Sequence, residues 1–135
     1  GARHVCGVRT DSSVACWGEN DQGQATPAGT NNFQDIAAGS SHTCGLRSTG
    51  AITCWGRSAE SQLAVPAGSY IDVVAGSAFA CGLRADGTVG CWGDATGGKT
   101  IPPAGAFAEL TAQANFACGL RIGGNAECWG ADAQG

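Results

Sequence analysis

Eight cysteines carry the most evident chemistry in this 135-residue sequence. They form four pairs, each with nine residues between its members: Cys6 and Cys16, Cys44 and Cys54, Cys81 and Cys91, and Cys118 and Cys128. Zinc sites favour cysteines separated by about two to four residues, so this spacing is a poor match for a metal. We therefore predict no metal site and four disulfide bonds, one within each pair.

The two histidines, His4 and His42, are the next candidates for chemistry. They occupy the same repeat position as Phe79 and Phe116, so this position selects a planar ring rather than a titrating group. No serine, cysteine or lysine has an unexplained base near it in the sequence. We expect no catalytic residue and no cofactor, and therefore no enzyme.

The cysteine pairs belong to a tandem repeat. Successive first cysteines are 38, 37 and 37 residues apart; each opens a Cys-Gly-(Val/Leu)-Arg motif, and each second cysteine opens Cys-Trp-Gly. A fixed period of this length indicates a repeat architecture. We divide residues 1–135 into one array of units, 1–38, 39–75, 76–112 and 113–135, the last of them incomplete.

Each cysteine pair flanks a turn. The turn triplets, such as Ala85-Asp86-Gly87, place glycine third in three of the four units, as a three-residue hairpin loop requires. Antiparallel pairing around such a loop sets Cys6 opposite Cys16 and puts Val8 and Val14 on the same apolar face. The other face carries small residues and an indole, so we expect the tryptophans to pack between neighbouring hairpins: Trp17, Trp55, Trp92 and Trp129.

A second pattern recurs between the hairpins. Segments 33–39, 70–76 and 107–113 read aromatic-x-x-apolar-x-Ala, which predicts a third strand leading into the next hairpin. Segments 19–29, 57–68 and 94–105 are polar loops, with room for a weak outer edge strand. A hairpin buried on both faces by its neighbours is typical of a propeller blade. The predicted fold is all-β: a β-propeller sector of about four units, each a disulfide-stapled hairpin plus one or two further short strands.

These motifs, with Gly23-Gln24 after the first hairpin, resemble the regulator-of-chromosome-condensation repeat. The resemblance is to the cysteine-bearing form found in secreted bacterial proteins and receptor ectodomains. It implies a propeller, usually of about seven four-stranded blades. Members of the family include a nucleotide-exchange factor and a secreted β-lactamase inhibitor, so the resemblance implies no single activity.

Charge and hydropathy narrow the classes of partner. The net charge is −4 and the seven basic residues are scattered, which argues against a nucleic-acid partner. No apolar run approaches the length needed to cross a bilayer, so we expect no membrane insertion. Disulfides persist in oxidising compartments, so we expect an extracellular or cell-surface location, or the periplasm. The sequence shows no secretory signal, which suggests a mature or excised product.

Two sets of residues remain once the repeat is accounted for. The recurrent arginines Arg9, Arg47, Arg84 and Arg121 stand at strand ends, where we expect them to pack over the tryptophan faces. The variable loops are the candidate contact surface. Their candidate residues are Glu19, Asn20, Asp21, Gln22, Arg57, Glu60, Gln62, Asp94 and Lys99.

The ends of the array suggest a function. The first hairpin lacks the strand that precedes the others, and four units are too few for the usual ring. Both terminal faces should expose tryptophan, leucine and strand edges, so the isolated chain should not be a stable monomer. We expect a non-enzymatic module acting through protein contacts, its partners being identical chains or further repeats. The alternative is a structural subunit of a self-assembling extracellular fibre or coat.

Overall fold

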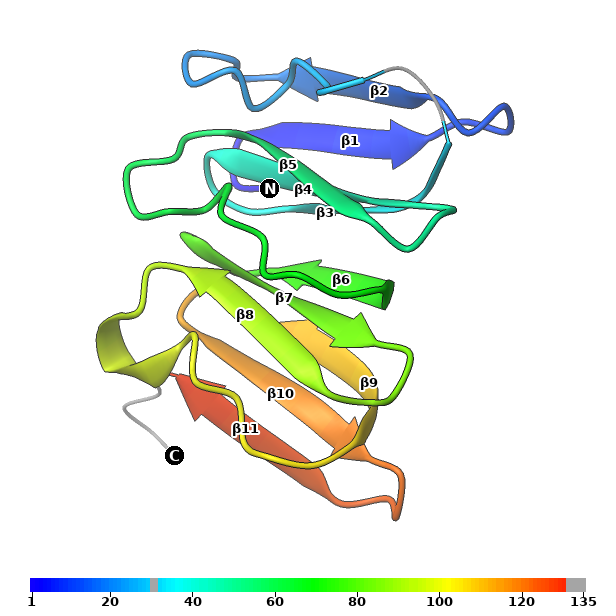
Figure 1. The fold of residues 1–135 in the computed structure, drawn as a ribbon. Helices are drawn as coiled ribbons and strands as arrows, with labels where there is room; N and C mark the ends of the chain where they lie inside the picture. Colours follow the sequence, from blue (N-terminus) through cyan, green and yellow to red (C-terminus); the bar gives the residue numbers. More distant parts are fainter. Residues whose placement is uncertain (30–31, 131–135) are drawn as a thin grey trace.

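The computed structural model describes residues 1–29 and 32–130, which form four antiparallel sheets. We call the sheets blades 1 to 4, and Figure 1 shows them following one another from top to bottom. Blade 1 contains β1 (His4–Val8) and β2 (Val14–Gly18); blade 2 contains β3 (Phe33–Ala38), β4 (His42–Arg47) and β5 (Ile52–Gly56); blade 3 contains β6 (Tyr70–Ala75), β7 (Phe79–Arg84) and β8 (Val89–Gly93); blade 4 contains β9 (Phe107–Ala112), β10 (Phe116–Arg121) and β11 (Ala126–Gly130). The predicted all-β architecture of about four blade units is confirmed.

The hairpins have the predicted register. Cys6 lies opposite Cys16, and the same pairing recurs in the other three hairpins. A disulfide joins each opposed pair, so all four predicted bridges are present. The third turn residue has a positive φ in every hairpin, at Gly50, Gly87, Gly124 and, in the first hairpin, Ser12. Glycine adopts this conformation without strain, which explains its preference there.

A third strand precedes the hairpin in blades 2 to 4, as predicted. β3, β6 and β9 pair with β4, β7 and β10 and form one edge of their sheets. We call them the inner strands, because they contact one another from blade to blade. Blade 1 has two strands, β1 and β2. The sheets are offset from the repeat units as we divided them, because β3 falls at the end of unit 1–38 yet pairs with β4.

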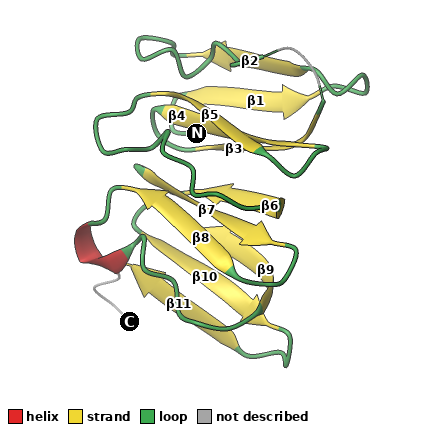
Figure 2. Cartoon of the chain, in the orientation of Figure 1, coloured by secondary structure: helices red, strands yellow, loops and turns green. Residues whose placement is uncertain are grey.

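The predicted weak outer strand is absent from the described residues of the loops after β2, β5 and β8. These loops form turns, and the third also contains the short 3₁₀ helix Thr96–Gly98, coloured red in Figure 2. In each loop two successive i→i+3 backbone hydrogen bonds use amides that a strand would need. They run from Gly23 to Asn20 and Thr26 to Gly23, with equivalents at 58–64 and 95–101.

The hydrophobic core lies between blades rather than within one layer. Its three clusters are Val14, Phe33 and Trp55 between blades 1 and 2; Leu46, Tyr70 and Trp92 between blades 2 and 3; and Leu83, Phe107 and Trp129 between blades 3 and 4. In each, a tryptophan packs against the cysteine-bearing face of the preceding blade. Adjacent blades therefore depend on one another for burial of their apolar faces.

Backbone hydrogen bonds also join neighbouring blades, both at the turns that follow the inner strands and at the hairpin turns. Ser40 N donates to Ser77 O (3.0 Å), and Ser77 N donates to Ala114 O (2.9 Å). At the other end, Tyr70 N donates to Gly50 O (2.8 Å). A Cβ at Gly39 would lie 2.6 Å from the carbonyl oxygen of Gly76, so the close approach of these turns requires glycine.

Candidate interaction surfaces

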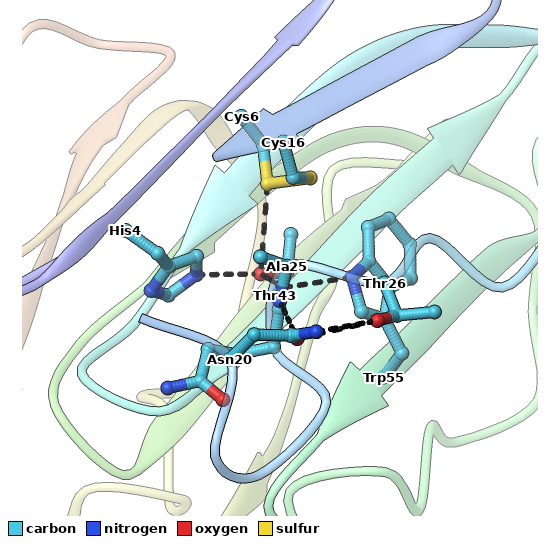
Figure 3. The surroundings of a disulfide bond; sticks show 9 residues. His4, Cys6, Cys16, Asn20, Ala25, Thr26, Thr43 and Trp55 are labelled. Carbon is cyan, nitrogen blue, oxygen red and sulfur yellow. Dashed lines mark hydrogen bonds between the residues drawn. A yellow bond between two sulfur atoms is a disulfide. The ribbon is translucent and has the colours of Figure 1, made fainter. Parts of the chain in front are cut away.

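Hydrogen bonds join blade 2 to blade 1 and to the loop after β2 (Figure 3). The carbonyl of buried Gln24 accepts hydrogen bonds from Trp55 Nε1 (3.0 Å) and from the Thr43 hydroxyl (2.9 Å). The loop carrying Gln24 is tied back by Asn20, whose Oδ1 accepts from Ala25 N at 2.8 Å. The loop after β2 is therefore part of the boundary, because it supplies the acceptor for the next blade's indole.

The loop after β5 repeats this arrangement, since Trp92 Nε1 donates to Gln62 O at 2.9 Å. At the third boundary the equivalent loop residue is Lys99, and Trp129 Nε1 is buried without a hydrogen-bond partner among the described residues. The prediction that Gln62 and Lys99 belong to a contact surface is corrected here, because these residues are 1% and 5% exposed. Gln62 accepts from Glu60 N (2.9 Å), and the Lys99 ammonium donates to Asp94.

The other predicted loop residues lie at or near the surface. Glu19 pairs with Arg3 (3.1 Å) and Arg57 with Glu60 (2.8 Å). Asn20, Asp21, Gln22 and Arg57 are exposed, while Glu19, Glu60 and Asp94 are half-buried. The hydrogen bond from Lys99 lowers the pKa of the Asp94 carboxyl to about 2.

These loop residues border shallow hollows shared with the turns that begin the next blades. One hollow is lined by Arg3, Glu19, Asp21, Gln22, Ser40 and Arg57, and a second by Ser41, His42, Arg57, Glu60 and Ser77 among others. Arg57 lines both. A contact role for this surface remains a prediction.

The sequence suggested that the recurrent arginines pack over tryptophan, and this prediction is wrong for Arg47, Arg84 and Arg121. In blades 2 to 4 the arginine covers the aromatic ring that opens the inner strand of its own blade. The distances from arginine Cζ to ring centroid are 4.4 Å for Arg47 and Phe33, 5.3 Å for Arg84 and Tyr70, and 4.0 Å for Arg121 and Phe107. The same guanidinium groups donate to the carbonyls of Ala28, Ala67 and Ala104. They link the strands to the loops before them.

The two terminal faces are open, as expected from the array. Trp55, Trp92 and Trp129 are buried between blades, but Trp17 is 59% exposed on blade 1, because no described blade covers it. On blade 4 Leu120 is 38% exposed, whereas its equivalents Leu46 and Leu83 are 1% and 2% exposed under the next blade. Leu110, Cys118, Leu120 and Ala126 line a hollow on this face.

Both histidines are buried. Burial lowers the pKa of His42 to about 4, and burial also lowers the pKa of His4. In the described ranges no group of three or more His, Cys, Asp or Glu residues is placed to hold a metal ion. No helix in the described part of the chain is long and apolar enough to span a membrane.

Our sequence analysis missed an acidic row, Asp35, Asp72 and Glu109, on the inner strands. Burial raises the pKa of Asp72, and Asp35 beside it raises it further. The signal was available, since these residues share one repeat position.

Comparison with known proteins identifies relatives in sequence and fold. The model for the Regulator of chromosome condensation (RCC1) repeat matches residues 1–24, 33–62 and 70–98. The CRINKLY WD40 ectodomain of the Arabidopsis thaliana receptor kinase ACR4 is 31% identical, with a TM-score of 0.79 over 96% of this chain and 48% of that one. The entire ectodomain of the Physcomitrella patens receptor kinase CR4 is also 31% identical, with a TM-score of 0.80 over 95% of this chain and 38% of that one.

Yeast RCC1 (Prp20), solved bound to Kap60, shares the fold at 16% identity, with a TM-score of 0.81 over 95% of this chain and 42% of that one. None of the curated proteins matches the chain. The chain spans less than half the length of each of these solved relatives.

Proposed function

Because this chain belongs to the regulator of chromosome condensation (RCC1) repeat family, we propose that it is a non-enzymatic protein-binding module whose open blade faces are covered by identical chains or further repeats. The observation that carries this proposal is the exposure of Leu120 and Trp17 at positions that the interior boundaries bury. Exposed apolar faces of this kind mark interaction sites in soluble proteins.

The two open faces are complementary in kind. Blade 4 exposes its cysteine-bearing face, which includes Leu120. In blades 1 to 3 the equivalent face packs against the tryptophan of the next blade. Blade 1 presents Trp17, the indole that such a face receives. A contact between these two faces is head-to-tail, and head-to-tail contacts form rings or open filaments depending on whether the rotation closes.

The relatives and the disulfides support the location and the type of partner. Four disulfides favour an oxidising compartment, and two relatives at 31% identity are receptor-kinase ectodomains. Both observations support an extracellular or cell-surface location, with the periplasm as the other oxidising compartment. One relative, yeast Prp20, was solved bound to Kap60, and a second structure of it is described with its binding to Gsp1p and histones, so this relative has protein partners. Protein partners therefore suit this chain, whose net charge of −4 disfavours nucleic acid.

The alternative function is a structural subunit of an extracellular fibre or coat. The observation that favours it is that the open faces differ from each other, so their contact need not close. Sedimentation velocity over a range of micromolar concentrations distinguishes the two functions. A module saturates as a small closed oligomer, whereas a fibre subunit keeps growing.

The same measurement tests the open-face proposal through a matched pair of variants. Leu120→Glu places a charge on the blade 4 face and should abolish association. Ile101→Glu changes an apolar side chain that is 71% exposed on a loop and should leave association unchanged. A wild-type chain that sediments as a 13.4 kDa monomer at every concentration would contradict the proposal.

A further inference from the structure

His42 lies at the boundary between blades 2 and 3 and has no polar partner for one of its ring nitrogens. The side chain is 1% exposed, and its Nε2 has no hydrogen-bond partner among the described residues. His42 alternates with Cys44 and Leu46 along β4, so it shares the face that packs against blade 3. Ala80 of β7 occupies the position that Thr43 holds one repeat earlier. A proton on Nε2 would therefore find no acceptor at this boundary.

The equivalent ring at the first boundary has a partner. Nε2 of His4 lies 2.7 Å from the Thr43 hydroxyl (Figure 3). This hydroxyl donates its own proton to Gln24 O at 2.9 Å, so its oxygen can accept a hydrogen bond from a protonated ring. The first boundary can therefore keep its histidine in place when the ring is charged.

The ring at the third boundary does not titrate. Phe79 of β7 occupies the position that His4 and His42 hold in the two preceding blades. The three boundaries therefore contain a paired imidazole, an imidazole with an unpaired nitrogen, and a phenyl ring. A buried N–H without an acceptor destabilises a packed interface, so acid should act most strongly on the second boundary.

The pKa of His42 gives the direction of its response to acid. Burial lowers this pKa to about 4; the backbone of Phe79 raises it in part, and the charges of His4 and the Gly1 amino group lower it. An imidazole released into water has a pKa of about 6.5. The open boundary therefore binds the proton first, and the closed boundary loses stability relative to it as the pH falls from about 6.5 to about 4.

The other charged groups at this boundary do not provide an acceptor for the ring. Arg57 and Glu60 line the hollow beside His42 and pair with each other at 2.8 Å. Asp35 and Asp72 lie on the inner strands of blades 2 and 3, and the pKa of Asp72 is raised mainly by burial and also by Asp35. Asp72 therefore favours the closed boundary as the pH falls, which is the opposite sign to His42.

We propose that the boundary between blades 2 and 3 is an acid-operated switch, in which protonation of His42 opens this boundary ahead of the other two and exposes the apolar cluster around Trp92. The open chain consists of two halves, blades 1 and 2 and blades 3 and 4, joined by the loop after β5. Each half keeps its own internal boundary, with Trp55 buried in one and Trp129 in the other. The switch is independent of the proposed function, because it lies inside the array rather than at its open faces.

One backbone hydrogen bond at each boundary can be used to detect its opening. It runs from the first amide of an inner strand to the hairpin turn of the preceding blade: Phe33 N to Ser12 O (3.0 Å), Tyr70 N to Gly50 O (2.8 Å) and Phe107 N to Gly87 O (2.8 Å). Hydrogen exchange followed by NMR gives a protection factor for each amide, which corrects for the intrinsic effect of pH on exchange.

The protection factor of Tyr70 should fall roughly fiftyfold between pH 7 and pH 4.5, as expected for a ring with a pKa of about 4 when closed and about 6.5 when open. The protection factors of Phe33 and Phe107 should change much less. No fall at Tyr70, or an equal fall at all three amides, would overturn the switch, because an equal fall indicates unfolding of the whole chain.

Three substitutions test whether His42 is the group that responds. His42→Phe removes the titrating ring and should abolish the fall in Tyr70 protection. Ala80→Thr supplies the hydroxyl that Thr43 supplies at the first boundary, so it should reduce the fall. Asp72→Asn is the control, because it removes a charge at the same boundary and should leave the fall in place. A Tyr70 response that survives His42→Phe would contradict the proposal.

The switch should also be transferable to the first boundary. Thr43→Ala removes the partner of His4 and reproduces the alanine that stands at the second boundary. In this variant the Phe33 amide should become sensitive to acid, and an unchanged response there would count against the role of the hydroxyl. Wild-type protection of the amides within the hairpins at pH 7 shows that each variant folds.

Discussion

The Thr43 hydroxyl lies 2.7 Å from Nε2 of His4, and this contact across the first blade boundary has no counterpart at the second. There Ala80 occupies the position of Thr43, and Nε2 of His42 is buried without a hydrogen-bond partner among the described residues. In the third blade both polar residues are gone, since Phe79 replaces the histidine. The position of His4 holds a planar ring in all four units, whereas the position of Thr43 holds a polar residue in one unit and alanine in the next.

His42→Phe should therefore stabilise the chain. The side chain is 1% exposed, and Phe79 fills the equivalent position in the next blade. Removing a buried unsatisfied polar atom should raise the free energy of unfolding by about 1 to 3 kcal/mol. Urea denaturation at pH 7 measures this. The comparison is His4→Phe, which also removes a buried nitrogen without a partner, Nδ1, but loses the contact between Nε2 and the Thr43 hydroxyl, so its gain should be smaller; a larger gain from His4→Phe than from His42→Phe would contradict the explanation.

The stability of the wild type should fall as the solution is acidified from about pH 6.5 to about pH 4. Burial lowers the pKa of folded His42 to about 4, from an unfolded value of about 6.5. The unfolded chain binds the proton first, so the stabilisation is complete above pH 6.5 and is lost as the pH falls, by roughly 3 kcal/mol. Denaturation of wild type and His42→Phe at pH 7, 5.5 and 4 should show a steeper decline for the wild type. Parallel curves would contradict this prediction.

Trp92→Ala should destabilise the chain far more than Trp17→Ala. Trp92 is buried between blades 2 and 3 and its indole donates to Gln62 O, so its removal should cost about 3 to 5 kcal/mol. Trp17 is exposed and should cost within about 0.5 kcal/mol in the free chain. The loop variant Glu60→Ala provides a second reference. Denaturant melts of the three variants with similar midpoints would show that the indoles do not hold the blades together.

The disulfides should contribute substantially to stability because the core is thin. Replacing both Cys81 and Cys91 with serine opens a link of sequence separation 10 and should lower the free energy of unfolding by about 2 to 3 kcal/mol. Thermal melts compare this variant with the oxidised wild type. A complementary check is peptide mapping without reductant, which should recover each cysteine joined to its partner in the same hairpin. Links between blades would contradict the assigned pairs.

Features set by short stretches of chain were predictable from the sequence. The opposition of Cys6 and Cys16 follows from a three-residue turn and the twofold alternation of a strand, both of which are local. The period of 37 to 38 residues then indicated a propeller, because each unit has an apolar face that only its neighbour can cover.

Contacts between a loop and the following blade were decided by the tertiary structure alone. Gln24 and Gln62 present main-chain carbonyls to indoles 31 and 30 residues further on, and a backbone acceptor leaves no signature in residue type. The arginines cover inner-strand rings rather than tryptophan because those strands pair beside the hairpin, which brings Phe33 opposite Arg47.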